Sequence, residues 1–322
     1  MSALANAPVC VIGGLGFIGV NLVDRLIAAR AAVTIVTPLR ERHADQADVF
    51  ERRGVRIVEG DLRDRELMPS VVDGQQIVFN LSGQSGAVRS MEDPWTDLDT
   101  NLRGNLALIE ATRAAARKPK LVFAGSRLQY GKPERLPVRE DDLGDPLCVH
   151  AVHKRTVEEY LKLYGHLFGL QYTIARITNP YGPGQPKGRT AYGVINRLIH
   201  LALADDALTI YGDGMQQRDY VHVADVVDAL LAMAVSEAAN GRAYNIASGV
   251  GSRMIDVANE IVRIAGGGRI DHVDWPELAK QIETGDFVAD ISRAKRELGW
   301  APRHALRAGL EETIAHYRAA GA

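Results

Sequence analysis

Short apolar runs alternate with amphipathic stretches through the first half of the chain. Runs typical of buried strands occupy residues 9–12, 33–36, 55–58, 77–80, 120–124 and 172–176. Between them lie helical patterns, most clearly at residues 98–117 and 153–168. This alternation of strand and helix predicts an α/β fold with a doubly wound parallel sheet of the Rossmann type.

The first apolar run leads directly into three regularly spaced glycines. Gly13 permits a tight turn, Gly16 allows the backbone to approach a pyrophosphate, and Gly19 allows the next helix to pack on the strand. The amides at the start of that helix then point toward the phosphates. We therefore predict that this segment, with Phe17 and Ile18, binds a dinucleotide cofactor.

After residue 176 the regular alternation ends. A turn-rich segment at 179–184 is followed by helical patterns at 194–203, 224–235 and 255–265 and by a strand at 208–211. We predict a dinucleotide-binding Rossmann domain at 1–176, with crossovers to a second lobe. Residues 177–322 should form mainly that smaller, mixed α/β, substrate-binding lobe. The cleft between the two parts is the expected ligand site.

Composition narrows the class of protein without identifying a function. The 322 residues are 46% hydrophobic and 24% charged, and the formal net charge of −2 argues against a nucleic-acid partner. Only two cysteines are present, Cys10 and Cys148, so a disulfide framework is excluded. We recognise no leader segment, no run of membrane-spanning length and no metal motif. We therefore expect a cytoplasmic protein with no metal and no membrane partner.

Several further motifs occur in order along the chain. They are Gly60-Asp61-Leu62-Arg63-Asp64, Leu81-Ser82-Gly83-Gln84, Ser126 with Tyr130-Gly131, Lys154, Arg176-x-x-Asn179-x-Tyr181-Gly182-Pro183, Gly212-Asp213-Gly214-x-x-x-Arg218-Asp219 and Leu298-Gly299-Trp300-x-Pro302. Together they resemble the extended short-chain dehydrogenase/reductase family, in particular its nucleotide-sugar epimerases and dehydratases. The resemblance implies NAD or NADP, a nucleotide-diphosphate sugar as substrate, and hydride transfer from a sugar carbon, usually C4.

The resemblance also implies a catalytic tyrosine, a lysine four residues later and a nearby Ser or Thr. Ser126 and Lys154 match, but His150 stands at the tyrosine position. Three interpretations remain open. His150 replaces the tyrosine as acid/base, because imidazole titrates near neutrality and a nearby Lys154 ammonium favours its neutral form. Alternatively, another group or the substrate moves the proton, or the oxidation step has been lost. His153 should face solvent or a neighbouring helix.

The residues after Ser126 bear on the type of reaction. Sugar 4,6-dehydratases of this family have an acidic pair there, whereas this chain has Arg127 and Leu128, and neither is a general acid. Residues 84–90, which include Gln84 and Arg89, resemble 4-epimerases, including those that act on uronic acids. An unconventional dehydratase, such as an NDP-hexosamine 5,6-dehydratase of antibiotic biosynthesis, is the alternative. A silent NAD(P)-binding regulatory protein is the alternative from another class.

The resemblance also assigns the ligand contacts. Those expected for the cofactor are Gly13, Gly16, Phe17, Ile18, Gly19, Thr37, Arg40, Asp61, Leu62, Leu81, Ser82, Gly83 and Lys154. Thr37 replaces the usual ribose-binding acid, and Arg40 and Arg42 follow it. These arginines would either bind the 2′-phosphate of NADP or lie on a solvated loop. NAD is favoured over NADP because an enzyme that recycles its hydride gains little from NADP.

Substrate contacts are expected from Gln84, Arg89, Asn179, Arg189, Tyr211 and Arg218. Asn179 and Arg218 match residues that bind the diphosphate. Glu283 occupies the position of a second diphosphate arginine, and Arg189 or Lys187 either compensates for it or lies on an exposed loop.

Family members commonly form homodimers through the helices that correspond to 99–117 and 153–168. Leu102, Leu106 and Ile109 lie at helical spacing and either serve such an interface or pack on the sheet.

Overall fold

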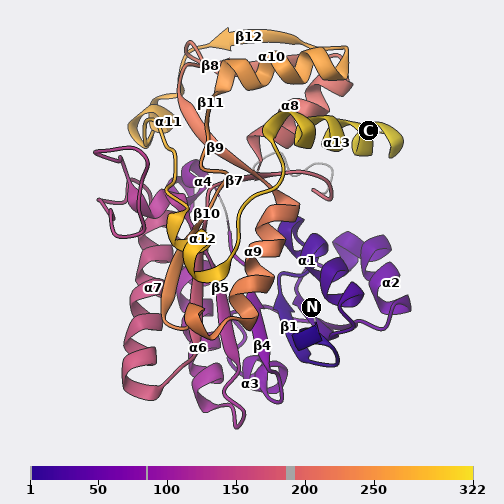
Figure 1. Ribbon diagram of the computed structural model, residues 1–322, viewed down its shortest axis with the longest axis vertical. Helices are drawn as coiled ribbons and strands as arrows, with labels where there is room; N and C mark the ends of the chain where they lie inside the picture. The colour runs from indigo at the N-terminus through magenta and orange to yellow at the C-terminus, as the bar shows by residue number, and fades with distance from the viewer. Residues whose placement is uncertain (1, 85, 186–192, 322) are drawn as a thin grey trace.

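The computed structural model describes residues 2–84, 86–185 and 193–321 (Figure 1). Its centre is a parallel sheet with the strand order β10-β6-β5-β4-β1-β2-β3. The strands are β1 (Pro8–Ile12), β2 (Ala32–Thr37), β3 (Arg56–Glu59), β4 (Ile77–Asn80), β5 (Lys120–Ser126), β6 (Tyr172–Ile177) and β10 (Arg242–Ile246). This arrangement confirms the predicted Rossmann-type sheet.

Helices cover both faces of the sheet. On one face lie α1 (Phe17–Ala28), α2 (Ala44–Arg52) and α9 (Val223–Val235), with a core that includes Leu22, Phe50 and Leu230. On the other face lie α3 (Leu67–Val72), α6 (Gly104–Ala114) and α7 (Val149–Phe168). Ile109 and Leu161 are fully buried there. Because both faces are covered, the strands read as continuous apolar runs rather than alternating ones.

A second, smaller lobe lies beyond the carboxyl ends of the strands, at the top of Figure 1. It contains α8 (Val194–Leu203), α10 (Met254–Ala265), α13 (Leu306–Ala319) and the paired strands β8 (Ala207–Tyr211) and β12 (Arg269–Val273). These elements share one core, built from residues such as Leu198, Ile261 and Leu310. The short strands β7 (Asn179–Tyr181), β9 (Gln217–His222) and β11 (Gly251–Arg253) form a further sheet.

The chain returns from the second half to the large sheet. β10 pairs with β6 in parallel register, and α9 packs beside α1, as the orange segments among the indigo and magenta ones show in Figure 1. Ala294 of α12 (Ser292–Leu298) and Trp300 also join the core of the α1 face. The boundary predicted after residue 176 is therefore crossed by α9, β10 and α12.

The connection between β4 and α6 positions part of the site. It contains α4 (Ala87–Glu92), α5 (Pro94–Asp97) and a π-helical turn (Leu98–Arg103) that runs directly into α6. Asp93 caps α5 by accepting the amide of Thr96 at 3.0 Å, and Pro94 suits the first helical position. A π-helical turn shifts the side chains that follow it and is frequent at functional sites.

The remaining elements are short. They are α11 (Glu277–Gln281) and the 3₁₀ turns at Ser2–Leu4, Glu41–His43, Arg127–Tyr130 and Glu237–Ala239. None of the helices in the described ranges has the length and apolarity needed to cross a membrane.

Candidate active site

The loop between β1 and α1 has the shape that a pyrophosphate requires. Gly13 has φ +82°, a conformation that favours glycine. A Cβ at Gly19 would overlap the carbonyl oxygen of Gly13. Gly16 is the N-cap of α1, and no side chain caps the first turn, which begins with Phe17 and Ile18. The amides of that turn are therefore left for an anionic group of the cofactor. The loop fits a bound dinucleotide.

The end of β2 lacks the usual ribose-binding acid and carries the buried Thr37. Its hydroxyl oxygen accepts the amide of Leu39 at 3.1 Å. Arg40 donates to Asp48 at 3.1 Å and to Glu51 at 2.9 Å, so two carboxylates already neutralise this guanidinium.

At the expected adenine pocket, Asp61 binds the side chain of Arg63 at 2.8 Å and Leu62 is buried. The hydrogen bonds from Arg63 outweigh burial and lower the pKa of Asp61.

The loop after β4 brings the next group of predicted residues together. Leu81 packs against the core of the α1 face. The hydroxyl of Ser82 donates to Asn80 at 2.6 Å. Gly83 has φ +146°, and a Cβ there would overlap Oδ1 of Asn101. Gln84 is buried, and its carbonyl accepts a hydrogen bond from Asn101 at 2.8 Å.

His150 lies in the first turn of α7 and is almost entirely buried. Its amide donates to the hydroxyl of Ser90 at 3.0 Å, which fixes the start of the helix. Its Nδ1 lies 3.3 Å from Nδ2 of Asn101 and 3.5 Å from Oδ2 of Asp97. The backbone of Gln84 is a further hydrogen-bond partner of the ring.

Asp97 is the centre of a buried polar cluster. Its side chain is fully buried, with Oδ1 2.7 Å from Nδ1 of His153 and Oδ2 accepting from Asn101 at 2.8 Å. Burial alone would raise the pKa of Asp97, but hydrogen bonds from the two histidines outweigh it and lower the pKa. His153 thus faces a neighbouring helix, as expected. Burial lowers the pKa of His150, while Asp97 opposes and Lys154 reinforces that shift.

Lys154 lies one turn further along α7. Its ammonium donates to the carbonyl of Ala124 at 2.9 Å and lies 4.7 Å from the ring centre of Phe123. Burial lowers the pKa of Lys154 to about 8.

Ser126 ends β5, and its hydroxyl oxygen accepts the amide of Leu128 at 3.2 Å. The nearby Tyr130 offers no substitute for the missing tyrosine. It is fully buried, and its hydroxyl is held by Asn245 at 2.5 Å and Arg176 at 3.0 Å.

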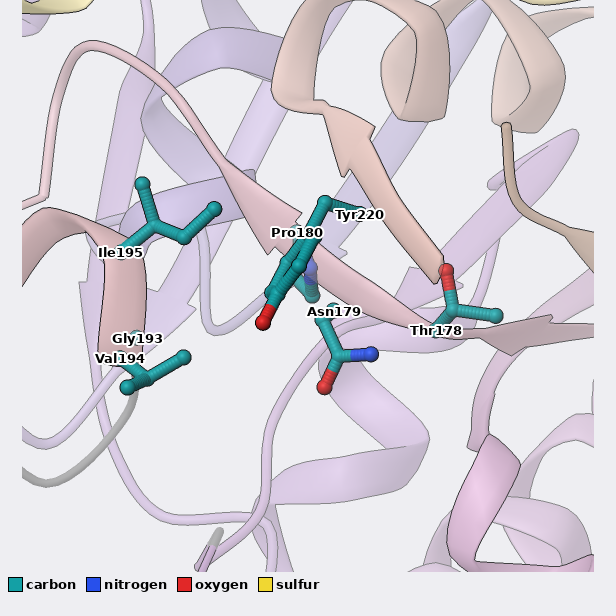
Figure 2. A pocket seen from close by; sticks show the side chains of 7 residues that line it. All are labelled: Thr178, Asn179, Pro180, Gly193, Val194, Ile195 and Tyr220. Carbon is teal, nitrogen blue, oxygen red and sulfur yellow. The ribbon is translucent and has the colours of Figure 1, made fainter. Parts of the chain in front are cut away.

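The residues expected at the diphosphate form a second polar cluster. Arg218 is paired with Glu283 and donates to the carbonyl of Gly285 at 2.8 Å. Asn179 donates to the carbonyl of Asp219 at 2.9 Å and accepts from Arg127 at 3.3 Å. A cavity of about 90 Å³ adjoins Asn179 and is also lined by Tyr220 and the start of α8. Figure 2 shows Asn179 and Tyr220 from β7 and β9 beside Val194 and Ile195.

The other predicted substrate contacts differ in their surroundings. Tyr211 packs against Trp275 in the second lobe, with the ring centres 5.3 Å apart and the planes tilted by 45°. Arg89 lies on α4, whose Ser90 contacts His150. Arg189 and Lys187 lie outside the described residues.

Among the described residues, the group with potential metal ligands is His222, His304 and Glu312. Its two imidazole rings are stacked at 4.3 Å, with 28° between their planes. Nδ1 of His222 accepts the amide of Ala224 at 3.4 Å, so Nε2 holds the proton in the neutral ring. This geometry does not favour a metal.

Asp97 and Asn101 are the site residues that the motifs did not identify. They lie about 50 residues before His150 in the chain, in a segment with no recognisable signature. Only the π-helical turn and the packing of α5 against α7 bring them to the imidazole. The buried carboxylate beside two histidines can therefore be recognised in the folded structure but not in the sequence.

Comparisons with known proteins identify the family. A profile described as the NAD dependent epimerase/dehydratase family matches residues 9–247. The chain is 32% identical over 319 residues to a UDP-glucose 4-epimerase of Mycolicibacterium smegmatis, covering 96% of this chain and 97% of that protein. It is also 32% identical to a UDP-N-acetyl-alpha-D-glucosaminuronate decarboxylase of Bacillus cytotoxicus, covering 95% and 96% of the two chains.

A similar solved structure is the UDP-glucose 4-epimerase of Thermotoga maritima with UDP-glucose. It has a TM-score of 0.90 and 28% identity, and the match covers 98% of this chain and 100% of that one. Since the family profile matches well over half of the chain and the sequence relatives match nearly all of it, the protein described here is an NAD-dependent enzyme of the epimerase/dehydratase family.

Proposed function

We propose that this enzyme inverts C4 of a UDP-sugar by oxidising the C4 hydroxyl and reducing the resulting ketone, with His150 as the acid/base. The observation that carries the proposal is the environment of His150. Oδ2 of Asp97 lies 3.5 Å from Nδ1. Nδ2 of Asn101 lies 3.3 Å from Nδ1, but it donates its hydrogens to Asp97 and to the Gln84 carbonyl. A carboxylate beside Nδ1 favours the proton on that nitrogen. Nε2 then has the lone pair that a general base needs.

The other groups support this assignment. Bound NAD supplies the hydride acceptor and donor, and the loop of Gly13, Gly16 and Gly19 would hold its pyrophosphate. Lys154 places a buried ammonium one helical turn from His150, where it stabilises negative charge that develops on the sugar oxygen. Ser126 would hold that oxygen in place through its hydroxyl. Desolvation lowers the pKa of His150, so the imidazole is neutral and able to accept a proton at pH 7.

The surroundings of Ser126 favour epimerisation over 4,6-dehydration. Arg127 follows Ser126, and its guanidinium donates to Asn179 and Thr284. It has no proton to give to a leaving hydroxyl at neutral pH. The relatives named as UDP-glucose 4-epimerases support UDP as the nucleotide.

A homodimer through α6 and α7 belongs to the same proposal. α7 exposes Leu163, Leu167 and Phe168. A groove of about 680 Å³ is lined by Leu106 of α6, Tyr164 of α7 and charged side chains such as Arg103. Ile109, by contrast, is buried against the sheet and does not reach this surface. The buried, unpaired Cys10 and Cys148 suit a reducing compartment, so we propose the cytoplasm, which cell fractionation would check.

The proposal is tested by replacing His150. The NAD-loaded wild type, His150→Phe and the matched control His166→Phe, at the far end of the same helix, are incubated with UDP-glucose and UDP-glucuronic acid. Products are identified by NMR. We expect the 4-epimer from one of these sugars, a loss of at least about a hundredfold in His150→Phe, and little change in the control.

Equal turnover by His150→Phe would rule out the acid/base role. If UDP-, dTDP- and GDP-hexoses all remain unconverted although NAD binds tightly, the alternative of a silent, NAD-binding regulator is favoured.

A further inference from the structure

Arg127 is a cation beside Ser126 that the proposed reaction does not use. It follows Ser126 at the carboxyl end of β5, where ligands bind in parallel α/β sheets. Its side chain reaches the second lobe. Nε donates to Asn179 at 3.3 Å, Nη1 donates to Thr284 at 2.9 Å, and the guanidinium lies 5.4 Å from the ring centre of Phe287.

The partners of Arg127 are neutral. In the described part of the chain no carboxylate forms an ion pair with it, and the nearby Glu283 is already paired with Arg218. Burial lowers the pKa of Arg127 to about 10, and the charge of Arg218 adds to this effect. The cluster of two arginines and one glutamate therefore has one uncompensated positive charge. Burying such a charge is unfavourable unless an anion joins it.

A cavity lies next to the neighbours of this cluster. It has a volume of about 90 Å³ and is lined by Asn179, which accepts a hydrogen bond from Arg127, and by Tyr220. Tyr220 lies close enough to both arginines for their charges to lower its pKa against the dominant effect of burial. We propose that Arg127 binds an anionic oxygen of the substrate and thereby replaces the second arginine that Glu283 displaces. This inference rests on the proposed nucleotide-sugar substrate. A guanidinium suits phosphate and carboxylate oxygens equally, since both accept its forked donors.

The substrate has two sources of such an oxygen. One is the diphosphate, next to Asn179 and Arg218. The other is a carboxylate on the sugar, as in a uronic acid, which Arg127 would reach from its place directly after Ser126. The two sources predict different binding patterns, because UDP has the diphosphate and lacks the sugar.

The test measures binding and not turnover. Dissociation constants of UDP, UDP-glucose and UDP-glucuronic acid are measured by calorimetry with NAD-loaded Arg127→Met, in a His150→Phe background that prevents conversion. Loss of a charged hydrogen bond weakens binding by roughly 10- to 100-fold. If Arg127 binds the diphosphate, all three ligands weaken by that factor. If it binds a sugar carboxylate, only UDP-glucuronic acid weakens.

Arg135→Met, at an exposed arginine, serves as the matched control, and melting curves verify the fold. If the dissociation constants of all three ligands for Arg127→Met stay within about twofold of those for the parent protein, the proposal is wrong. If Arg127→Met does not fold, Arg127→Lys decides, because it keeps the positive charge but loses the forked donors of the guanidinium. Binding of both UDP and UDP-glucuronic acid by Arg127→Lys within about twofold of the parent protein would then count against the anion site. Failure of the parent to bind any UDP-sugar refutes the proposed function as well, whereas failure of the Arg127 variants alone leaves the His150 test intact.

Discussion

Replacing Asp97 by asparagine removes one negative charge from the cluster around His150 with little change in shape. In the native protein the carboxylate favours the proton on Nδ1 of His150. An asparagine amide can instead donate to Nδ1, which moves the ring proton to Nε2, where it blocks proton abstraction. We therefore expect Asp97→Asn to bind NAD and substrate normally but to turn over slowly.

The distances set the size of the effect. At 3.5 Å, a carboxylate and an imidazolium attract by about 5 kcal/mol at an effective dielectric constant of about 20. Asp97 also binds His153 at 2.7 Å and Asn101 at 2.8 Å, so only part of this energy acts on His150. A hydrogen bond to a charged group contributes about 1.5–3 kcal/mol. We therefore expect kcat/KM to fall roughly 10- to 150-fold.

Two measurements separate this role from a merely structural one. The first is kcat/KM as a function of pH. Asp97 raises the pKa of His150 against the larger effect of burial, so its loss should move the acid limb to lower pH while the plateau falls. The second is the NMR spectrum of ¹⁵N-labelled histidine, which reports which ring nitrogen of His150 holds the proton.

Asp99→Asn is the matched control, because Asp99 lies two residues away on the same segment and is exposed. If Asp97→Asn keeps kcat/KM within threefold of the wild type, with the same acid limb and the same tautomer, the argument for an oriented base fails.

Three further predictions concern Lys154, the cofactor and the dimer. Turnover should fall above about pH 8, because burial lowers the pKa of Lys154 to about 8 and the neutral amine no longer stabilises the sugar oxyanion. In the same pH titration, Lys154→Arg should move this alkaline limb of the rate profile to higher pH. NAD should bind more tightly than NADP in fluorescence titrations, because Glu51 already neutralises Arg40. Glu51→Gln should reduce the ratio of the NADP and NAD dissociation constants about three- to tenfold. In sedimentation experiments, Leu167→Glu should be monomeric at concentrations where the wild type is dimeric. The control Val235→Glu changes an exposed valine outside α6 and α7 and should remain dimeric. If both variants are dimeric, the proposed α7 interface is wrong.

Much of the fold is predictable because burial on both faces makes the central strands apolar throughout, as in Val78, Val122 and Ile174. The glycine loop is predictable for a different reason, since Gly13 and Gly19 satisfy local backbone constraints that a side chain would break. β10 is harder to recognise, because Arg242–Ile246 is short and mixed in polarity.

The site is predictable only where a motif precedes or follows a strand. Ser126 and Lys154 match family positions, whereas Asp97 does not. The role proposed for Asp97 depends on its complete burial and on its contacts with His150 and His153, which lie more than 50 positions away in the chain. Likewise, the sequence places Glu283 near an expected diphosphate contact, but only the fold shows that it is paired with Arg218.

The late position of β10 constrains how this protein is made. Until residue 246 has left the ribosome, β6 has no neighbour on one side, and its row of amides and carbonyls stays open to other chains. The two lobes therefore cannot be exchanged between relatives by a simple cut near residue 177. Such a chimera would join one protein's sheet to another's last strand, so any successful recombination has to carry α9 and β10 together with the nucleotide-binding half.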